Sequence, residues 1–170
     1  RLNRVVTTFL DFSRPVEVHF EDVDLGGLAK EVAELVRPQA TVGNIELTCE
    51  VPAEPAMMRG DPDLLKQAVL NLVTNAVEAM SPNGGSLRVC VSRSGDNWVL
   101  EVADTGPGIP PALRDKVFQL YFTSKAKGSG IGLAMTYRAA QLHNGTITFT
   151  SESGRGTTFR LEFPALVAHV

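Results

Sequence analysis

The sequence predicts an α+β fold in which a mixed sheet is backed by helices on one face. Segments with helical periodicity are interleaved with segments that alternate like strands. Several of the strand-like segments are joined by short turns, as in antiparallel hairpins. The 170 residues, of which 44% are hydrophobic, suffice for one domain with a buried core.

An apolar stripe at helical spacing runs along residues 1–12. Pro15 ends this predicted helix, because proline disfavours helical conformation in the residue before it. A stripe so strong on so short a helix predicts a partner outside the core of this chain. Its members are Leu2, Val5, Val6, Phe9 and Leu10.

Two strands and a helix are predicted next. Residues 16–23 alternate between apolar and polar, and so do residues 44–51. Between them, Asp24 is placed to cap a helix that runs to about Arg37 and ends before Pro38.

A long helix is predicted from Pro62 to about Met80. Asp61 supplies a capping carboxylate, and proline suits the first helical position because an N–H there would have no helical partner. Pro82 and the glycines after it end the helix. Its buried face is predicted from apolar residues at helical spacing: Leu65, Ala68, Val69, Leu72, Val73 and Ala76.

The second half of the chain contains two predicted hairpins. The first joins residues 86–92 to 97–103 through a Ser-Gly-Asp turn, and the second joins residues 145–152 to 156–163. The intervening chain is predicted to form, in order, a loop over 104–111, a short helix over 111–117, a glycine- and lysine-rich stretch over 121–130 and a helix from Ile131 to about Leu142.

Charge and composition exclude some functions. A net charge of −3 argues against a nucleic-acid binder that neutralises many phosphates. No run of 18 apolar residues occurs and no signal peptide opens the chain, so neither a membrane span nor secretion is predicted. Cys49 and Cys90 lack metal-ligand spacing and are expected as buried free thiols in a reducing compartment.

Three polar residues line up on the predicted helix over 62–80. Asn71, Asn75 and Glu78 are spaced i, i+4 and i+7, so they share a face beside the buried one. Asn is a modest helix former, and two of them one turn apart suggest a shared task, such as an amide oxygen on Mg²⁺. An exposed polar face without such a task is the alternative that spacing leaves open.

Asp104 leaves a predicted strand and enters a turn that contains Gly106 and Gly108. A carboxylate at this place can accept a hydrogen bond from an exocyclic amine such as that of adenine, and the glycines let a ligand approach the backbone. A plain turn with Asp at its start is the alternative.

A glycine-rich run opens the helix that follows Ile131. Free N–H donors and the positive end of a helix dipole suit a phosphate group there. Neither the P-loop pattern nor the dinucleotide fingerprint is present. Lys125 is predicted to neutralise phosphate charge, whereas Lys127 is expected to be solvated. The run consists of Gly128, Ser129, Gly130, Ile131, Gly132 and Leu133.

Five stretches in order resemble the ATP-binding fold shared by histidine kinases, DNA gyrase, MutL and the heat-shock chaperone family. The resemblance covers about residues 15–164, and five motifs in the right order argue strongly against a chance match. The stretches are DPDLLKQAVLNLVTNAVEAM, DTGPGIP, FQLYFTSK, GSGIGLA and GRGTTFRLEFP.

The resemblance implies a Bergerat fold: a two-layer α/β sandwich with a mixed, mostly antiparallel sheet, helices on one face and a lid over ATP. It implies that Asp104 holds the adenine amine, with Thr157 nearby through water. It implies Asn75 as the Mg²⁺ ligand, with Asn71 and Glu78 close to the phosphates.

Further residues of the implied ATP site follow from the same resemblance. Gly106, Gly108 and Ile109 would line the base pocket. Lys125 and the run over 128–133 would meet the phosphates as the lid closes. Phe118 and Phe122, in FQLYFTSK, resemble the hinge of the lid in histidine kinases.

Asn71 favours a histidine kinase among the members of this superfamily. In the ATPase and serine/threonine-kinase members, a Glu stands one turn before the residue that matches Asn75, and it activates water or a hydroxyl. Asn cannot take a proton, whereas a neutral imidazole is already nucleophilic. Asn71 and Lys125 are therefore the predicted catalytic residues of a histidine protein kinase.

Three alternatives stay open beside this prediction. An ATPase or clamp domain of the gyrase and MutL type, and a serine kinase of the same superfamily, are both disfavoured by Asn71. A nucleotide sensor without catalysis is the third. The NAVEAM ending resembles the nitrogen-regulation type of sensor kinase.

The resemblance also divides the chain. Residues 1–14 resemble the end of the last helix of the dimerisation and phosphoacceptor domain, and residues 15–170 form the catalytic ATP-binding domain. His19, His143 and His169 lie outside any acceptor motif and are expected as surface or capping residues, so the acceptor histidine is expected upstream of residue 1.

The implied partners follow from this division. They are the dimerisation helices of the same protein and the receiver domain of a response regulator, with no nucleic acid. The 170-residue chain is expected to be a monomer and the parent a homodimer. A cytoplasmic location is expected, in a parent that is either soluble or membrane-anchored.

Overall fold

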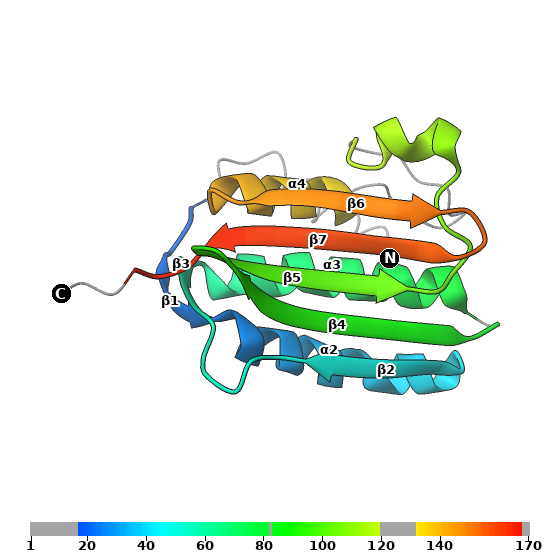
Figure 1. Cartoon of the computed structure of the whole chain (residues 1–170), viewed down its shortest axis with the longest axis horizontal. Coiled ribbons are helices and arrows are strands. Elements are labelled where there is room, and N and C mark those ends of the chain that lie inside the picture. The colour runs from blue at the N-terminus through cyan, green and yellow to red at the C-terminus, as the bar shows by residue number, and fades with distance from the viewer. Residues whose placement is uncertain (1–16, 82, 120–131, 168–170) are drawn as a thin grey trace.

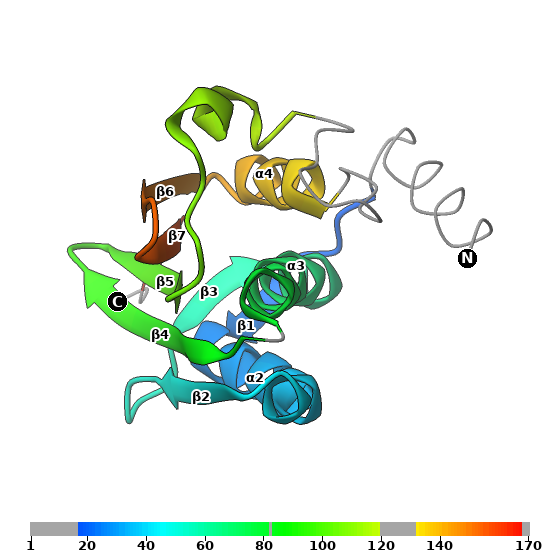
Figure 2. The same ribbon diagram turned by 90° about the vertical axis from the view of Figure 1, so that its right-hand side faces the viewer.

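The structure is a computed structural model that describes residues 17–81, 83–119 and 132–167. In this part of the chain, a five-stranded sheet forms one layer and three α-helices form the other (Figure 1). Figure 2 shows all three helices on the same side of the sheet. The predicted α+β sandwich is confirmed. The predictions for residues 1–12 and 121–130 lie outside the described residues.

The large sheet is mixed and mostly antiparallel. Its strand order is β2-β4-β5-β7-β6, in which only β2 and β4 pair in parallel. Both predicted hairpins are confirmed, as β4–β5 and β6–β7, and the β5–β7 pair joins them. The strands are β2 (Ile45–Glu50), β4 (Gly85–Ser94), β5 (Asn97–Asp104), β6 (Thr146–Glu152) and β7 (Gly156–Pro164).

The two faces of this sheet differ in polarity. Alternation points β-branched and aliphatic residues such as Val89, Leu100 and Leu161 toward the helices, where they are buried. The opposite face carries threonines and ion pairs, including one between Arg88 and Glu50 at 3.2 Å. Because this face is polar, the sheet needs no second cover.

Three α-helices supply the other half of the core. They are α2 (Leu25–Val42), α3 (Pro62–Met80) and α4 (Gly132–Leu142). All six residues predicted for the buried face of α3 are buried. Each large aliphatic side chain among them contributes about 1.5–3 kcal/mol by leaving water. The predicted short helix after the 104–110 loop is a 3₁₀-helix, η1 (Pro111–Lys116).

Asp61 caps α3 and also holds the chain that leads into the domain. Its Oδ1 accepts hydrogen bonds from the N–H groups of Asp63 (3.0 Å) and Leu64 (3.2 Å), and its Oδ2 accepts one from His19 (3.0 Å). Burial opposes ionisation, but these N–H donors outweigh it and lower the pKa of Asp61.

Asp61→Ala is expected to lower the free energy of unfolding by about 1–2 kcal/mol, because it removes the cap of α3. Asp61→Asn keeps an oxygen that can cap α3 and is expected to lower the free energy of unfolding less than Asp61→Ala does. Since the pKa of Asp61 is lowered on folding, the advantage of wild type over Asp61→Asn should shrink as pH falls through the folded pKa. Urea denaturation at several pH values measures both. Wild-type stability in Asp61→Ala would contradict the prediction, and the exposed Asp63 provides the control.

The predicted end of α2 at Arg37 is wrong. The helix continues through Pro38 to Val42, and the backbone N–H of Gly43 bonds the carbonyl of Gln39 at 3.0 Å. Proline removes only its own N–H donor, and Pro38 lies on the exposed side, where water can bond the carbonyl of Glu34. Burial of Ala40 on the opposite side favours the extra turn.

The predicted strand over 16–23 is too long, and a short strand was missed. Only β1 (Glu21–Asp24) pairs, antiparallel to β3 (Met57–Gly60), in a separate two-stranded sheet. Pairing stops at Glu21 because its partner Gly60 is followed by Asp61, where the backbone turns into the cap of α3. His19 then bonds the Asp61 carboxylate instead of a strand.

His143 is buried, which corrects its expected place at the surface. It is 3% exposed, and its Nε2 accepts a hydrogen bond from the backbone N–H of Asp61 at 3.0 Å. Its Nδ1 lies 2.7 Å from the carbonyl oxygen of Ala139, so the donating proton is on Nδ1. The ring stacks on Phe20 and contacts Phe163. His143 is thus a structural link between α3, α4 and the entering chain.

Two smaller predictions concern membranes and thiols. Within the described ranges, no helix is long and apolar enough to cross a bilayer. Cys49 and Cys90 are free and half-buried, which is less burial than predicted. Burial raises the pKa of the Cys49 thiol.

Candidate functional site

Asp104 and Thr157 meet where β5 ends and β7 begins, as directly paired residues. The Oδ1 of Asp104 accepts hydrogen bonds from the N–H groups of Gly106 (2.9 Å) and Thr157 (3.3 Å). No described residue donates to its Oδ2. One carboxylate oxygen is therefore fixed by the backbone, and the other is an acceptor for a ligand donor.

The environment of Asp104 disfavours its charge. Burial raises the pKa of this carboxyl, and the two N–H donors only partly oppose the increase. A half-buried carboxylate, one oxygen of which accepts from no residue that the structure describes, would gain from an amine donor. The geometry therefore fits the predicted adenine contact.

Two glycines let the backbone close around Asp104. Gly108 has φ +79°, and a Cβ there would lie 2.5 Å from the carbonyl oxygen of Glu152. Gly156 has φ +128°, and a Cβ there would overlap the carbonyl oxygen of Asp104. Gly106 is buried against Met80 of α3. Side chains at these positions would push β5, α3 and the β6–β7 turn apart.

The loop after Asp104 is tied to the β6–β7 hairpin at two points. The N–H of Ile109 donates to Ser151 Oγ at 2.7 Å, and the N–H of Gly154 donates to the carbonyl of Pro107 at 2.7 Å. Arg114 in η1 donates from Nε to the carbonyl of Ile109 at 3.1 Å. These bonds fix the predicted base-pocket loop relative to Thr157.

Asn71 joins the middle of α3 to the first residue of α4. Its Nδ2 donates to the carbonyl of Gly132 at 3.2 Å, and its Oδ1 accepts from Gln67 Nε2 at 3.1 Å. Thr136, fully buried, donates to the same Gly132 carbonyl at 3.0 Å. The start of α4 is thereby held beside the polar residues of α3.

The other predicted residues of α3 and α4 lie along the same path. Asn75 is half-buried one turn after Asn71, and Glu78 is exposed. Leu133 is half-buried and packs against the core. Lys125, Gly128, Ser129, Gly130 and Ile131 lie outside the described residues, as do Lys127 and Phe122.

An aromatic cluster fixes the chain just before residue 120. The ring of Phe118 contacts Tyr137 of α4 (centroids 5.5 Å apart), Phe149 of β6 (5.8 Å) and Phe159 of β7 (6.2 Å). These contacts anchor Phe118 to two strands and a helix, and its hinge role stays a prediction.

Ser151 was missed by sequence reasoning. It lies opposite Thr157 in the β6–β7 register, with its Oγ 2.9 Å from Thr157 Oγ1. A signal existed, because the inward positions of β6 are Ile147, Phe149 and then Ser151. A polar residue that continues an apolar alternation marks a place where the buried face meets a polar site.

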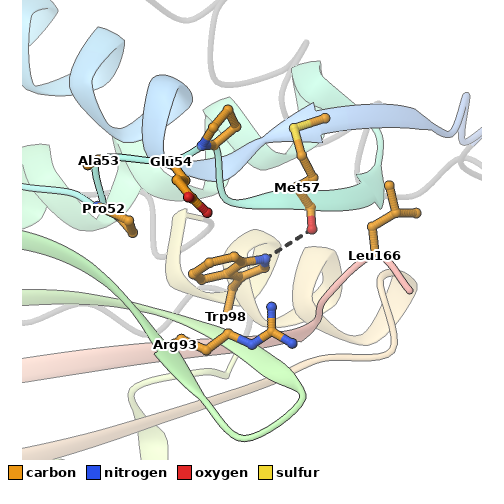
Figure 3. Close-up of a pocket in the computed structure, with 8 residues that line it drawn as sticks. Pro52, Ala53, Glu54, Met57, Arg93, Trp98 and Leu166 are labelled. Atoms are coloured by element: carbon orange, nitrogen blue, oxygen red, sulfur yellow. Dashed lines mark hydrogen bonds between the residues drawn. The ribbon is translucent and has the colours of Figure 1, made fainter. Parts of the chain in front are cut away.

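A separate hollow of about 630 Å³ lies at the other end of β5 (Figure 3). Trp98 lines it and donates from Nε1 to the carbonyl of Met57 at 3.0 Å, and Arg93 lies over the indole ring at 5.0 Å. Because Trp98 and Asp104 stand at opposite ends of one strand, this hollow is not part of the predicted ATP site.

Comparison with known proteins identifies the family. Residues 60–167 match the family described as histidine kinase-, DNA gyrase B-, and HSP90-like ATPase. The chain is 37% identical over 164 residues to the sensor histidine kinase ZraS of Escherichia coli strain K12. This alignment covers 96% of the chain and 35% of ZraS, so the chain spans about a third of that relative's length.

Solved structures give the same answer. Full-length ShkA in complex with AMPPNP superposes with a TM-score of 0.87 at 30% identity, over 99% of this chain and 37% of ShkA. The catalytic domain of the histidine kinase ThkA superposes with a TM-score of 0.78 at 30% identity, over 86% of this chain and 95% of that domain. ThkA in complex with the response regulator protein TrrA gives 0.81 at 26% identity, over 98% of this chain and 48% of that one.

One family assignment follows from the two-layer fold, from the fixed carboxylate at the end of β5 and from these similarities. The chain belongs to the family of histidine kinase-, DNA gyrase B-, and HSP90-like ATPases, and within it to the ATP-binding catalytic domains of sensor histidine kinases.

Proposed function

We propose that this domain binds MgATP and transfers its γ-phosphoryl group to a histidine of the dimerisation domain, for relay to an aspartate of a response regulator. ZraS and ThkA are histidine kinases, ShkA was solved with AMPPNP, and ThkA was solved with a response regulator. These likenesses support the nucleotide, the reaction and the partner.

Asn71 is the observation that favours transfer to histidine over hydrolysis. Both ends of its amide are engaged, the nitrogen with the Gly132 carbonyl and the oxygen with Gln67. A Glu here would set a carboxylate against that carbonyl, and Asn offers no base for water. Neutral imidazole needs no base, because one ring nitrogen already carries a lone pair.

The base of ATP would be held at Asp104. Its Oδ2 would accept a hydrogen bond from the 6-amino group of adenine, with Thr157 nearby through water. Gly106, Gly108 and Ile109 would line the base. This placement is supported by the fixed Oδ1 and by burial of the carboxyl, for which a donor is the matching partner.

The phosphates would lie between α3 and the start of α4. Asn75 would offer an amide oxygen to Mg²⁺, which when bound neutralises phosphate charge; Asn71 and Glu78 would lie nearby. The N-terminus of α4 at Gly132 and Leu133, with Lys125 and residues 128–131, would receive the phosphates.

The transfer step balances without a protein base. The lone pair of an imidazole nitrogen attacks the γ-phosphorus, the bond to the β–γ bridging oxygen breaks, and ADP leaves with that electron pair. The proton on the other ring nitrogen then passes to solvent, which leaves a neutral phosphohistidine ring. The task of Asn71 and Lys125 is to position the phosphates and, for Lys125, to offset their charge.

The wider assignments belong to the same proposal. Residues 1–14 would be the end of a dimerisation helix and residues 15–170 the catalytic domain. The parent would be a homodimer whose catalytic part is cytoplasmic, where ATP and response regulators occur.

Calorimetric titration of this chain with ATP and Mg²⁺ tests the proposal. Saturable binding followed by a flat baseline is expected, because the acceptor histidine is not among His19, His143 and His169. Steady heat release after saturation would mean that the domain hydrolyses ATP, and the proposed kinase would then be rejected in favour of an ATPase.

Asn75→Ala is expected to weaken ATP binding at least about tenfold in the presence of Mg²⁺, because a ligand to a charged ion is lost. Binding in EDTA should change little. Asn97→Ala is the matched control, since Asn97 bonds Glu162 at the far end of β5. If the ATP affinity of Asn75→Ala depended on Mg²⁺ as strongly as that of wild type, Asn75 would not be a ligand of the metal ion.

A further inference from the structure

Ser151 stands at the junction of three parts of the base pocket. Its Oγ accepts a hydrogen bond from the N–H of Ile109 at 2.7 Å. The same oxygen lies 3.2 Å from the Gly156 carbonyl, to which it can donate, and 2.9 Å from Thr157 Oγ1. It therefore contacts the loop after β5, the β6–β7 turn and the hydroxyl of Thr157, the residue predicted to lie near the adenine amine through water.

The protons available to these groups limit how Thr157 can point its hydroxyl. Ser151 has one proton and two lone pairs, and Ile109 takes one of the lone pairs. If Ser151 donates to Gly156, Thr157 donates to Ser151 and offers the pocket only acceptor lone pairs. The carbonyl of Gly156 can only accept, so its approach to Ser151 Oγ at 3.2 Å favours the first arrangement. A hydroxyl paired in this way does not rotate freely to suit any ligand.

The hydroxyl that Ser151 holds belongs to the residue paired with Asp104. The backbone N–H of Thr157 donates to Asp104 Oδ1, and Thr157 is 6% exposed. Ser151 is half-buried and faces the same side of the sheet. Ser151 thus bonds the side-chain hydroxyl of Thr157, while the backbone N–H of the same residue bonds the carboxylate.

We propose that Ser151 is a positioning residue for base recognition, which acts through Thr157 to favour a 6-aminopurine over a 6-oxopurine nucleotide. This inference rests on the proposed function, in which Asp104 accepts from the amine of the base. When Ser151 fixes the orientation of the Thr157 hydroxyl, the pocket keeps one pattern of donors and acceptors, which matches the 6-aminopurine. A freely rotating Thr157 hydroxyl could donate to or accept from either base, which would weaken the discrimination between 6-aminopurine and 6-oxopurine.

The test is a double-mutant cycle on nucleotide binding. Ser151→Ala, Thr157→Val and the double variant are titrated with ATP and with GTP, each with Mg²⁺. Ser151→Ala is expected to raise the Kd for ATP about tenfold and to lower the ratio of GTP Kd to ATP Kd. In the Thr157→Val background, the same substitution should raise the ATP Kd less than about threefold, because coupled residues are not additive.

A purely structural Ser151 gives a different pattern. It would lower the melting temperature and leave the GTP-to-ATP ratio unchanged, or would act equally in both backgrounds, and either result overturns the inference. Thr150→Ala, one residue earlier and on the exposed face, is the control and should match wild type.

Asp104→Asn separates this inference from the proposed function. If Asp104→Asn leaves ATP binding unchanged, the base lies elsewhere and both fail. If Asp104→Asn removes binding while Ser151→Ala binds ATP and GTP as wild type does, only the role of Ser151 is rejected.

Discussion

Asp104→Asn is expected to weaken ATP binding about 100-fold. The amide oxygen of Asn can keep both backbone hydrogen bonds of Oδ1, from Gly106 and Thr157. The amide nitrogen then takes the place of Oδ2 and sets N–H donors against the amine of adenine. An unpaired donor pair in a half-buried pocket costs more than a lost bond.

The same variant is expected to fold at least as stably as wild type without nucleotide. Burial raises the pKa of the Asp104 carboxyl, so its charge is less favourable in the folded chain than in the unfolded one. A carboxyl with a raised folded pKa loses stability as pH rises from the unfolded pKa through the folded one. Asn carries no charge and avoids this loss at neutral pH.

Two measurements check the prediction together. Calorimetry gives the Kd for ATP, and thermal unfolding of the apo domain between pH 4 and 8 gives the stability. Asp115→Asn, on the exposed side of η1, is the control. A strongly destabilised Asp104→Asn would show that Asp104 is chiefly structural.

Gly156→Ala is expected to destabilise the domain by more than about 3 kcal/mol and to abolish ATP binding. Its φ of +128° is strained for any residue with a Cβ, and the added atom would overlap the carbonyl oxygen of Asp104. Relief requires the ends of β5 and β7 to separate, which pulls Thr157 from the Asp104 carboxylate. Thermal unfolding and ATP titration measure the two effects.

Gly154→Ala is the matched control for strain without overlap. Gly154 lies in the same turn with φ +80°, and a Cβ there would meet no atom within 4 Å. It should cost about 1 kcal/mol and leave ATP affinity within about twofold. If both alanine variants lose the same stability, the close approach of Gly156 to Asp104 adds nothing to the cost of the Gly156→Ala substitution.

Much of the fold could be predicted because its signals are local. The start of α3 follows from Asp61 and Pro62, and the structure confirms Asp61 as the cap, which accepts hydrogen bonds from Asp63 and Leu64. The hairpins follow from alternation and a short turn, which need no information from distant residues. Pro38 misled the prediction because its cost depends on which side of α2 faces water.

The missed features depend on distant contacts. β3 is four residues long and pairs only with β1, over 30 residues earlier in the chain, so its sequence carries little alternation. His143 is buried where it accepts a hydrogen bond from Asp61, 82 residues away. Such partners are absent from any local window of sequence.

The residues of the candidate site likewise divide into those that local motifs predict and those that depend on distant contacts. Asp104, Gly108 and Asn71 belong to motifs whose order predicts the family, and the structure brings Asp104 to Thr157 and Asn71 to Gly132. Ser151 belongs to no quoted motif. Its importance follows from bonds to Ile109 and Thr157 that only the paired strands create.

The central position of the β5–β7 pair has a consequence for folding kinetics. Each hairpin closes a short loop, whereas Asp104 and Thr157 are 53 residues apart, so their pairing carries the larger loop-closure entropy and is expected to form late. Because both residues belong to the proposed base pocket, a nucleotide bound there would recognise only chains in which this pairing has formed. ATP should therefore slow unfolding by its binding free energy and leave the folding rate almost unchanged.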